Sequence, residues 1–239
     1  MVAEEEVKSV EEFLNTIKRY KETTNQEDFL FRGQVDDHPL IPKIGRLHPK
    51  GELLEIEKLL LEEFKRTNPL LIEGHQSYDD WDYLTLGQHY GLPTRLLDWS
   101  NNALTALWFA TNRIMVNSES ENSNAIVWVL MASAEDYISD ISQTHPFEIQ
   151  VTKIFRPRII KQRINNQSGV FSIQSSLEIQ QKCQLNSIYP FSEKLLKIKL
   201  PFESLKGIRT DLNVLGVNAF SIFPELEGLC AYLQWRYFE

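Results

Sequence analysis

Several features that would assign a protein to a class at once are missing from this sequence. It has two cysteines among 239 residues, Cys183 and Cys230, which are far apart and match no metal-binding spacing. Two isolated thiols of this kind are typical of reduced, buried residues in a cytosolic protein. The longest apolar run, AIVWVLMA at 125–132, is far too short to span a bilayer. The acidic N-terminus, MVAEEEVKSVEEF, does not resemble a signal peptide, so we expect a cytoplasmic protein.

Basic residues are not in excess, and the common catalytic motifs are absent. The chain has 25 basic and 33 acidic residues, a net charge of −8, which disfavours a general nucleic-acid binder. Its five histidines are scattered, without an HxH or HxxxH pair, so we predict no metal site. No GxSxG, GxGxxG or GxxxxGK[ST] motif occurs. A Ser-His-Asp hydrolase and a glycine-rich phosphate loop are therefore unsupported.

Hydrophobic periodicity predicts both helices and strands. Helical patterns or end signals occupy 7–20, 49–69, 78–91, the stretch after Trp99, 201–216 and 225–238. Apolar runs predict strands at 27–34, 125–131, 170–174 and 195–200, and the unbroken run at 125–131 is typical of a central strand. Because helices come first and most strands later, we predict a single α+β domain with N-terminal helices and a mixed or antiparallel sheet.

Local signals fix several details of these helices. Ser9 is a plausible N-cap of the first helix, and Ser100 or Asn101 is expected to cap the helix that follows Trp99. Gly91 is expected to end the helix at 78–91. The helix at 49–69 is expected to bury one face, formed by Leu53, Ile56, Leu60 and Phe64.

In the stretch FLFRGQ, 29–34, the apolar run of a predicted core strand is followed directly by Arg32 and Gly33. A core strand rarely ends on an unpaired charge, so we expect Arg32 to lie at the mouth of a cleft and to bind an anion. Gly33 would then allow close backbone approach, and Gln34 is a further candidate ligand-binding residue.

The densest polar stretch is GQHYGLPTRLLDWS, 87–100, with candidate ligand-binding residues Gln88, Tyr90, Thr94, Arg95 and Asp98. Arg95 and Asp98 are three residues apart and could pair on a helical turn. Such a pair either tethers the turn or orients the arginine to bind a ligand anion. His89 has the same two interpretations, as a hydrogen-bonded structural residue or a catalytic one.

Two further features allow a structural and a functional interpretation. The segment 153–167 holds five basic and no acidic residues, namely Lys153, Arg156, Arg158, Lys161 and Arg163. These charges either balance acidic neighbours or bind a polyanion, which would be a dinucleotide or nucleic acid. Glu225 opens the last predicted helix. It either complements the helix macrodipole, which is worth about 0.3–1 kcal/mol, or faces the cleft that Arg32 enters.

Five segments together resemble the FRG domain family. FRGQ is followed by LIPKIGR, LGQHYGLPTRLLDWSNNALTALWFA, RINNQSGVFSIQ and LGVNAFSIFPELEGL, in the order and approximate spacing of the family pattern. Ser100 stands where the pattern has threonine, which keeps the hydroxyl. The resemblance implies an FRG domain over 28–239, preceded by an N-terminal helical extension over 1–27.

The family resemblance also implies a distant relation to the ADP-ribosyltransferase fold, in which two small sheets surround a nicotinamide dinucleotide. In that fold an arginine or histidine on the first strand holds the ligand and a late glutamate assists transfer. Arg32 and Glu225 match these places, whereas the fold's serine-threonine-serine strand has no counterpart here. The implied cofactor is NAD, and no metal is needed.

On this hypothesis each candidate residue has a role. Arg32 binds a phosphate or the ribose-nicotinamide end of NAD, and Arg95, oriented by Asp98, takes the other phosphate. Tyr90 stacks on a ring. Glu225 stabilises the oxocarbenium-like transition state and acts as a general base, and His89 is the third candidate catalytic residue.

Three functional hypotheses follow. The first is an NAD-processing ADP-ribosyltransferase or glycohydrolase of a prokaryotic toxin or defence system. The second is a non-catalytic module that binds a nucleotide, nucleic acid or a protein. The third is a metal-independent nuclease, for which the overall acidity is unfavourable.

Overall fold

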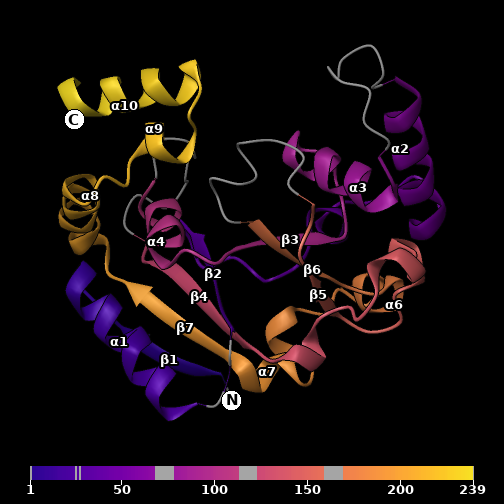
Figure 1. Ribbon diagram of the computed structural model, residues 1–239, viewed down its shortest axis with the longest axis horizontal. Helices are drawn as coiled ribbons and strands as arrows, with labels where there is room; N and C mark the ends of the chain where they lie inside the picture. Colours follow the sequence, from indigo (N-terminus) through magenta and orange to yellow (C-terminus); the bar gives the residue numbers. More distant parts are fainter. Residues whose placement is uncertain are drawn as a thin grey trace.

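A mixed sheet of seven strands runs through the residues that the computed structural model describes, which are 2–24, 26, 28–67, 78–112, 123–158 and 169–238 (Figure 1). The strand order is β1-β7-β4-β2-β3-β6-β5. β1 is parallel to β7, and the other neighbouring pairs are antiparallel. The predicted α+β class with a mixed sheet is confirmed. The strands are β1 (Ala3–Glu6), β2 (Asp28–Gln34), β3 (Leu96–Ser100), β4 (Ala125–Ala132), β5 (Lys153–Phe155), β6 (Gly169–Ile173) and β7 (Leu195–Leu200).

Helices cover the sheet in two groups, which Figure 1 shows on either side of its centre. One group lies beside β1, β7, β4 and β2, and comprises α1 (Val10–Thr23), α4 (Ala103–Thr111), α8 (Leu205–Val214), α9 (Ala219–Ile222) and α10 (Leu226–Phe238). The other lies beside β3, β6 and β5, and comprises α2 (Leu53–Thr67), α3 (Asp80–His89) and α6 (Ser176–Gln180). The short helix α7 (Phe191–Lys194) precedes β7, and the 3₁₀ turn η1 (Lys43–Arg46) precedes α2.

Hydrogen bonds at the helix ends show which local signals operate. The Ser9 hydroxyl accepts from the Glu12 amide and caps α1, as predicted. Gly91 follows α3 in a left-handed conformation with φ of 85°, as expected for a helix terminator. The predicted cap of α4 was wrong by one or two residues, because Asn102 accepts from the amides of Leu104 and Thr105.

The sheet opens between β2 and β3. β2 pairs with β4 along its whole length, and β3 pairs with β6 along its whole length. Between β2 and β3 the register contains a single pair, Phe31 opposite Ser100. Arg32 and Gly33 therefore follow the last point at which the two halves of the sheet are joined, and their neighbour across the opening is β3.

Helix α4 crosses β2 at Gly33 with no room for a side chain. A Cβ atom at this position would lie 1.9 Å from the carbonyl oxygen of Ala106 and 2.7 Å from the amide nitrogen of Ala110. Gly33 is thus fixed by the close approach of α4, which packs with Phe29, Phe31 and the apolar face of α1 in one core cluster. This contact holds the helix over the opening of the sheet.

Three details differ from the sequence-based expectations. The buried face of α2 is centred on Leu53, Glu57 and Leu61, so a carboxylate occupies its middle. Cys183 is partly exposed and Cys230 is exposed, although both were expected to be buried. The segment 1–27 contains a strand, β1, which pairs with β7, besides the expected helix.

Candidate functional site

The opening of the sheet contains a cavity of about 390 Å³. β2 contributes one wall and β3 with β6 the other, while α3 and α4 close the sides and Phe223 covers part of the rim. The lining residues are Phe31, Arg32, Gly33, Thr85, Gln88, His89, Asp98, Trp99, Ser100, Ala106, Phe109, Gly169, Phe171 and Phe223. Five of these are aromatic and Asp98 carries a carboxylate, so the cavity combines flat apolar surface with one anionic and one cationic side chain.

Arg32 reaches across the opening. Its Nη1 donates to the backbone carbonyl of Asp98 at 2.8 Å and lies 3.5 Å from the Asp98 carboxylate. The guanidinium thereby supplies a donor to a β3 carbonyl at the place where pairing with β2 has ended. Its buried Nε has no hydrogen-bond partner within the described part of the chain. Burial lowers the pKa of the Arg32 guanidinium, and the positive charge of Arg46 lowers it further. The negative charge of Asp98 acts in the opposite direction and raises this pKa.

Asp98 is held by a chain of side chains from α3 and the following turn. Gln88 Nε2 donates to both carboxylate oxygens of Asp98, at 3.1 and 3.0 Å. The Gln88 carbonyl oxygen in turn accepts from the Thr94 hydroxyl at 2.5 Å, and that hydroxyl also accepts from the Leu96 amide. Thr94 is fully buried. Gln88 and Thr94 therefore position Asp98, whose side chain remains 56% exposed.

The predicted pairing of Arg95 with Asp98 is wrong. Arg95 lies in a bend and Asp98 in the strand β3, so the two residues do not share the helical turn on which a pair three positions apart would meet. Arg95 is fully buried and makes a bidentate ion pair with Glu57 of α2, with the shortest contact at 2.5 Å. It also donates to the Pro146 carbonyl and the Ser176 hydroxyl. Arg95 joins α2 to the sheet and does not line the cavity.

Two other predicted ligand-binding residues have structural contacts. Gly33 lines the cavity, but the close approach that it allows is that of the α4 backbone. Gln34 is 8% exposed, and its side-chain oxygen accepts from Trp128 Nε1 at 3.1 Å. A glycine or a glutamine at a strand end gives no sequence signal that would separate packing from ligand contact.

His89 lines the cavity, whereas its neighbour Tyr90 does not. Their rings meet edge to face with centroids 5.0 Å apart, and Tyr90 is 60% exposed. Thr85, which sequence reasoning missed, lines the cavity one turn before His89. It is fully buried, and its hydroxyl has no hydrogen-bond partner among the described residues. A threonine on an apolar helix face gives no signal of its own.

Glu225 is exposed and precedes α10, where its carbonyl accepts from the Leu229 amide. It is not a lining residue of the cavity, although Phe223, two residues earlier, is one. In this segment an aromatic ring, and not the carboxylate, therefore borders the cavity. Phe223 packs edge to face on Phe109, with centroids 6.0 Å apart.

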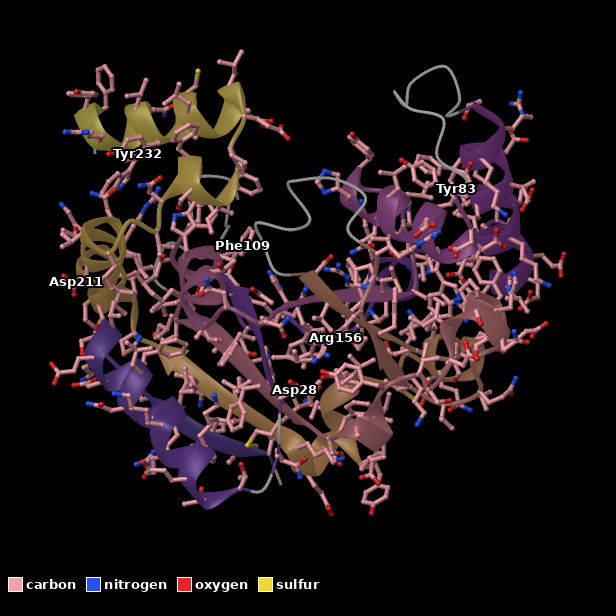
Figure 2. The ribbon with its side chains drawn as sticks, viewed as in Figure 1. Asp28, Tyr83, Phe109, Arg156, Asp211 and Tyr232 are labelled. Carbon is pink, nitrogen blue, oxygen red and sulfur yellow. The ribbon has the colours of Figure 1, made fainter. Side chains whose placement is uncertain are left out.

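The described cations of the basic segment have local partners. Arg156 forms an ion pair with Asp28 at 2.7 Å, and Arg158 pairs with Asp82 and Asp79. Figure 2 labels Asp28 and Arg156. Lys153 donates to the Glu135 carbonyl at 2.7 Å. For Arg156 and Arg158 the structure favours charge balance over a polyanion site, whereas Lys153 contacts an uncharged backbone carbonyl. Lys161 and Arg163 lie outside the described residues.

Within the described ranges, no group of three or more histidine, cysteine, aspartate or glutamate side chains is arranged to hold a metal ion. In the same ranges, no helix has both the length and the apolar character that crossing a membrane requires.

Comparison with known proteins gives one result. The family model described as the FRG domain matches residues 27–119, which include β2, η1, α2, α3, β3 and α4. Most of the cavity lining comes from this matched segment. Neither the curated proteins nor the solved structures give a match to the chain.

Proposed function

We propose that the cavity binds a nicotinamide dinucleotide and that the protein breaks its nicotinamide–ribose bond, as an ADP-ribosyltransferase or glycohydrolase does. One observation carries this proposal: Arg32 and Asp98 meet, 3.5 Å apart, in an aromatic-lined cavity at the opening of the sheet. A split sheet around a ligand is the arrangement that the family resemblance implies.

The aromatic residues suit the nicotinamide ring. Phe109 and Phe223 are only partly buried and lie at right angles to each other beside the cavity. Nicotinamide in NAD is a planar cation, and a cation over an aromatic face is stabilised by about 0.5–2 kcal/mol. The unpartnered Thr85 hydroxyl is a candidate hydrogen-bond partner for the carboxamide group.

Asp98 is the carboxylate to which we assign the chemistry, in place of Glu225. The bond between C1′ and the pyridinium nitrogen breaks with its electron pair moving to nitrogen, which releases neutral nicotinamide. Asp98, held by Gln88, stabilises the positive charge that develops on the ribose. The oxygen of water, or of another acceptor, then bonds to C1′, and its proton passes to the Asp98 carboxylate and on to solvent.

A second candidate function is nucleotide binding without turnover. It is favoured by the contacts of Asp98, because both of its carboxylate oxygens accept from Gln88 and one lies close to Arg32. A carboxylate with these contacts would also serve to orient the arginine for an anion.

The test is incubation of the purified protein with NAD while free nicotinamide is followed by chromatography. We expect release by the wild type and a loss of at least about a hundredfold in Asp98→Asn. Asp211→Asn, on the exposed face of α8, is the matched control and should be fully active. Release that is equal in Asp98→Asn and wild type would overturn the catalytic assignment. NAD binding without release would favour the binding module.

A further inference from the structure

A second cavity, of about 330 Å³, adjoins the first. It lies between the end of β2, the segment 35–46 and α4, and it shares Arg32, Gly33 and Phe109 with the first cavity. Phe109 is labelled in Figure 2. A ligand that occupied both cavities would therefore contact Arg32 from each.

The polar side chains that line the second cavity include two arginines and a histidine and no carboxylate, and the rest of its lining is apolar or amide. Arg32, Arg46 and His38 are among its lining residues. The two acids of the adjacent loop have other partners: Asp37 pairs with Lys197 at 2.6 Å, and Asp36 accepts from Ser123. The local charge is therefore positive in a protein whose net charge is −8.

Part of the donor capacity of this cavity is not used by the protein itself, although Arg32 Nη1 donates to the Asp98 carbonyl. The buried Nε of Arg32 has no acceptor among the described residues, and the Arg46 side chain is exposed and forms no ion pair with them. Arg46 is close enough for its charge to act on Arg32. Two arginines that repel each other are stabilised by an anion placed between them.

The backbone that carries Arg46 is fixed before any ligand binds. In η1 the Ile44 amide donates to the Thr94 carbonyl, and Ile44 is buried against Ile179 and Leu53. A Cβ atom at Gly45 would lie 2.9 Å from Ile41 and 3.1 Å from Ile179. This packing leaves the Arg46 side chain free to turn towards an anion. Because the backbone that carries it is already ordered, the entropic cost of binding is lowered.

We propose that the second cavity binds the phosphate groups of a nucleoside diphosphate ester whose ring lies in the first cavity, with Arg46, Arg32 and His38 as donors. This inference deepens the proposed function, on which it rests for the position of the ring. Arginine presents donors in a planar fork that matches phosphate oxygens. Two arginines and an imidazole therefore suit a diphosphate ligand better than they suit a ligand with a single carboxylate.

The test is calorimetric titration of wild-type protein and of Arg46→Gln with ADP-ribose, inorganic pyrophosphate and nicotinamide. We expect Arg46→Gln to bind ADP-ribose and pyrophosphate about tenfold more weakly, which is the loss typical of one charge-assisted hydrogen bond, and nicotinamide equally well. Arg66→Gln is the matched control, since Arg66 is exposed and pairs with Glu63 on α2. Arg46→Lys, which keeps the charge and loses the fork, should recover part of the affinity.

The outcomes separate the two proposals. Weakened ADP-ribose binding in Arg46→Gln supports the phosphate site even where the wild type releases no nicotinamide, in which case the catalytic proposal alone fails. Equal affinities in Arg46→Gln and Arg66→Gln overturn the phosphate site even where nicotinamide is released. Absence of binding by ADP-ribose and by pyrophosphate also overturns it. Binding of a single-stranded oligonucleotide alone, weakened in Arg46→Gln, would replace it with a polynucleotide site.

Discussion

Two arginine–carboxylate pairs flank β3, and they differ in what surrounds them. Arg95 and Glu57 have side chains 0% and 2% exposed, and their polar atoms are bound by protein groups. Arg32 and Asp98 are 19% and 56% exposed, border a cavity, and leave Arg32 Nε unpartnered within the described part of the chain. The same two chemical groups therefore make a structural crosslink in one place and a site with spare donors in the other.

The largest effect is expected from the buried pair. Glu57→Gln leaves the Arg95 charge buried without a counter-ion, which we expect to lower the free energy of unfolding by about 3–5 kcal/mol. The measurement is urea denaturation. A double variant, Glu57→Leu with Arg95→Met, replaces both charges by apolar groups and should recover most of the loss. A loss below about 1 kcal/mol in Glu57→Gln would mean that the pair is not a crosslink.

A medium effect on stability is expected at Gly33, which packs against α4 and also lines the cavity. Gly33→Ala places a Cβ atom against the Ala106 carbonyl, so α4 must shift, and we expect a loss of about 1–3 kcal/mol in stability. Because α4 also carries Phe109, NAD or ADP-ribose binding should weaken as well. Gly207→Ala, in α8, is the control, because its Cβ atom meets no heavy atom within 4 Å. Equal stability in both variants would contradict the close packing.

A small stability effect with a large binding effect is expected at the exposed pair. Arg32→Gln should change the free energy of unfolding by about 0–1 kcal/mol, because a partly solvated ion pair contributes little. The same variant should abolish nucleotide binding in a thermal-shift assay. An effect of more than about 2 kcal/mol on stability, or intact binding, would place Arg32 with Arg95 among the structural residues.

The sequence distinguished these two arginines only in part. Arg32 was recognisable because it follows an apolar run within β2, where an unpaired charge is costly. Arg95 was misassigned because its partner, Glu57, is 38 residues away in sequence. The periodicity of α2 also placed Glu57 outside the face of that helix that was expected to be buried. Strand order, the opening beside Phe31 and the approach of α4 to Gly33 depend on contacts distant in sequence. The Ser9 cap and the strands β2, β4, β6 and β7 depend on local signals and were predicted, whereas β1, β3 and β5 were not.

The smallest effect concerns a polar cluster that also joins the two halves of the sheet. Tyr137 donates to Asp28 of β2 at 2.9 Å, and Arg156, after β5, pairs with the same carboxylate (Figure 2). Burial, together with the Asp28 hydrogen bond, raises the pKa of Tyr137 to about 12. A phenol whose pKa is raised on folding contributes stability that is complete below its unfolded pKa, about 10, and is lost as the pH rises towards 12.

Wild-type stability should therefore fall more steeply between pH 10 and 12 than that of Tyr137→Phe, which removes the ionisable hydroxyl. Denaturation midpoints at a series of pH values measure the difference, with Tyr237→Phe, on the exposed end of α10, as the control. Parallel curves for Tyr137→Phe and wild type would show that the phenol does not resist ionisation.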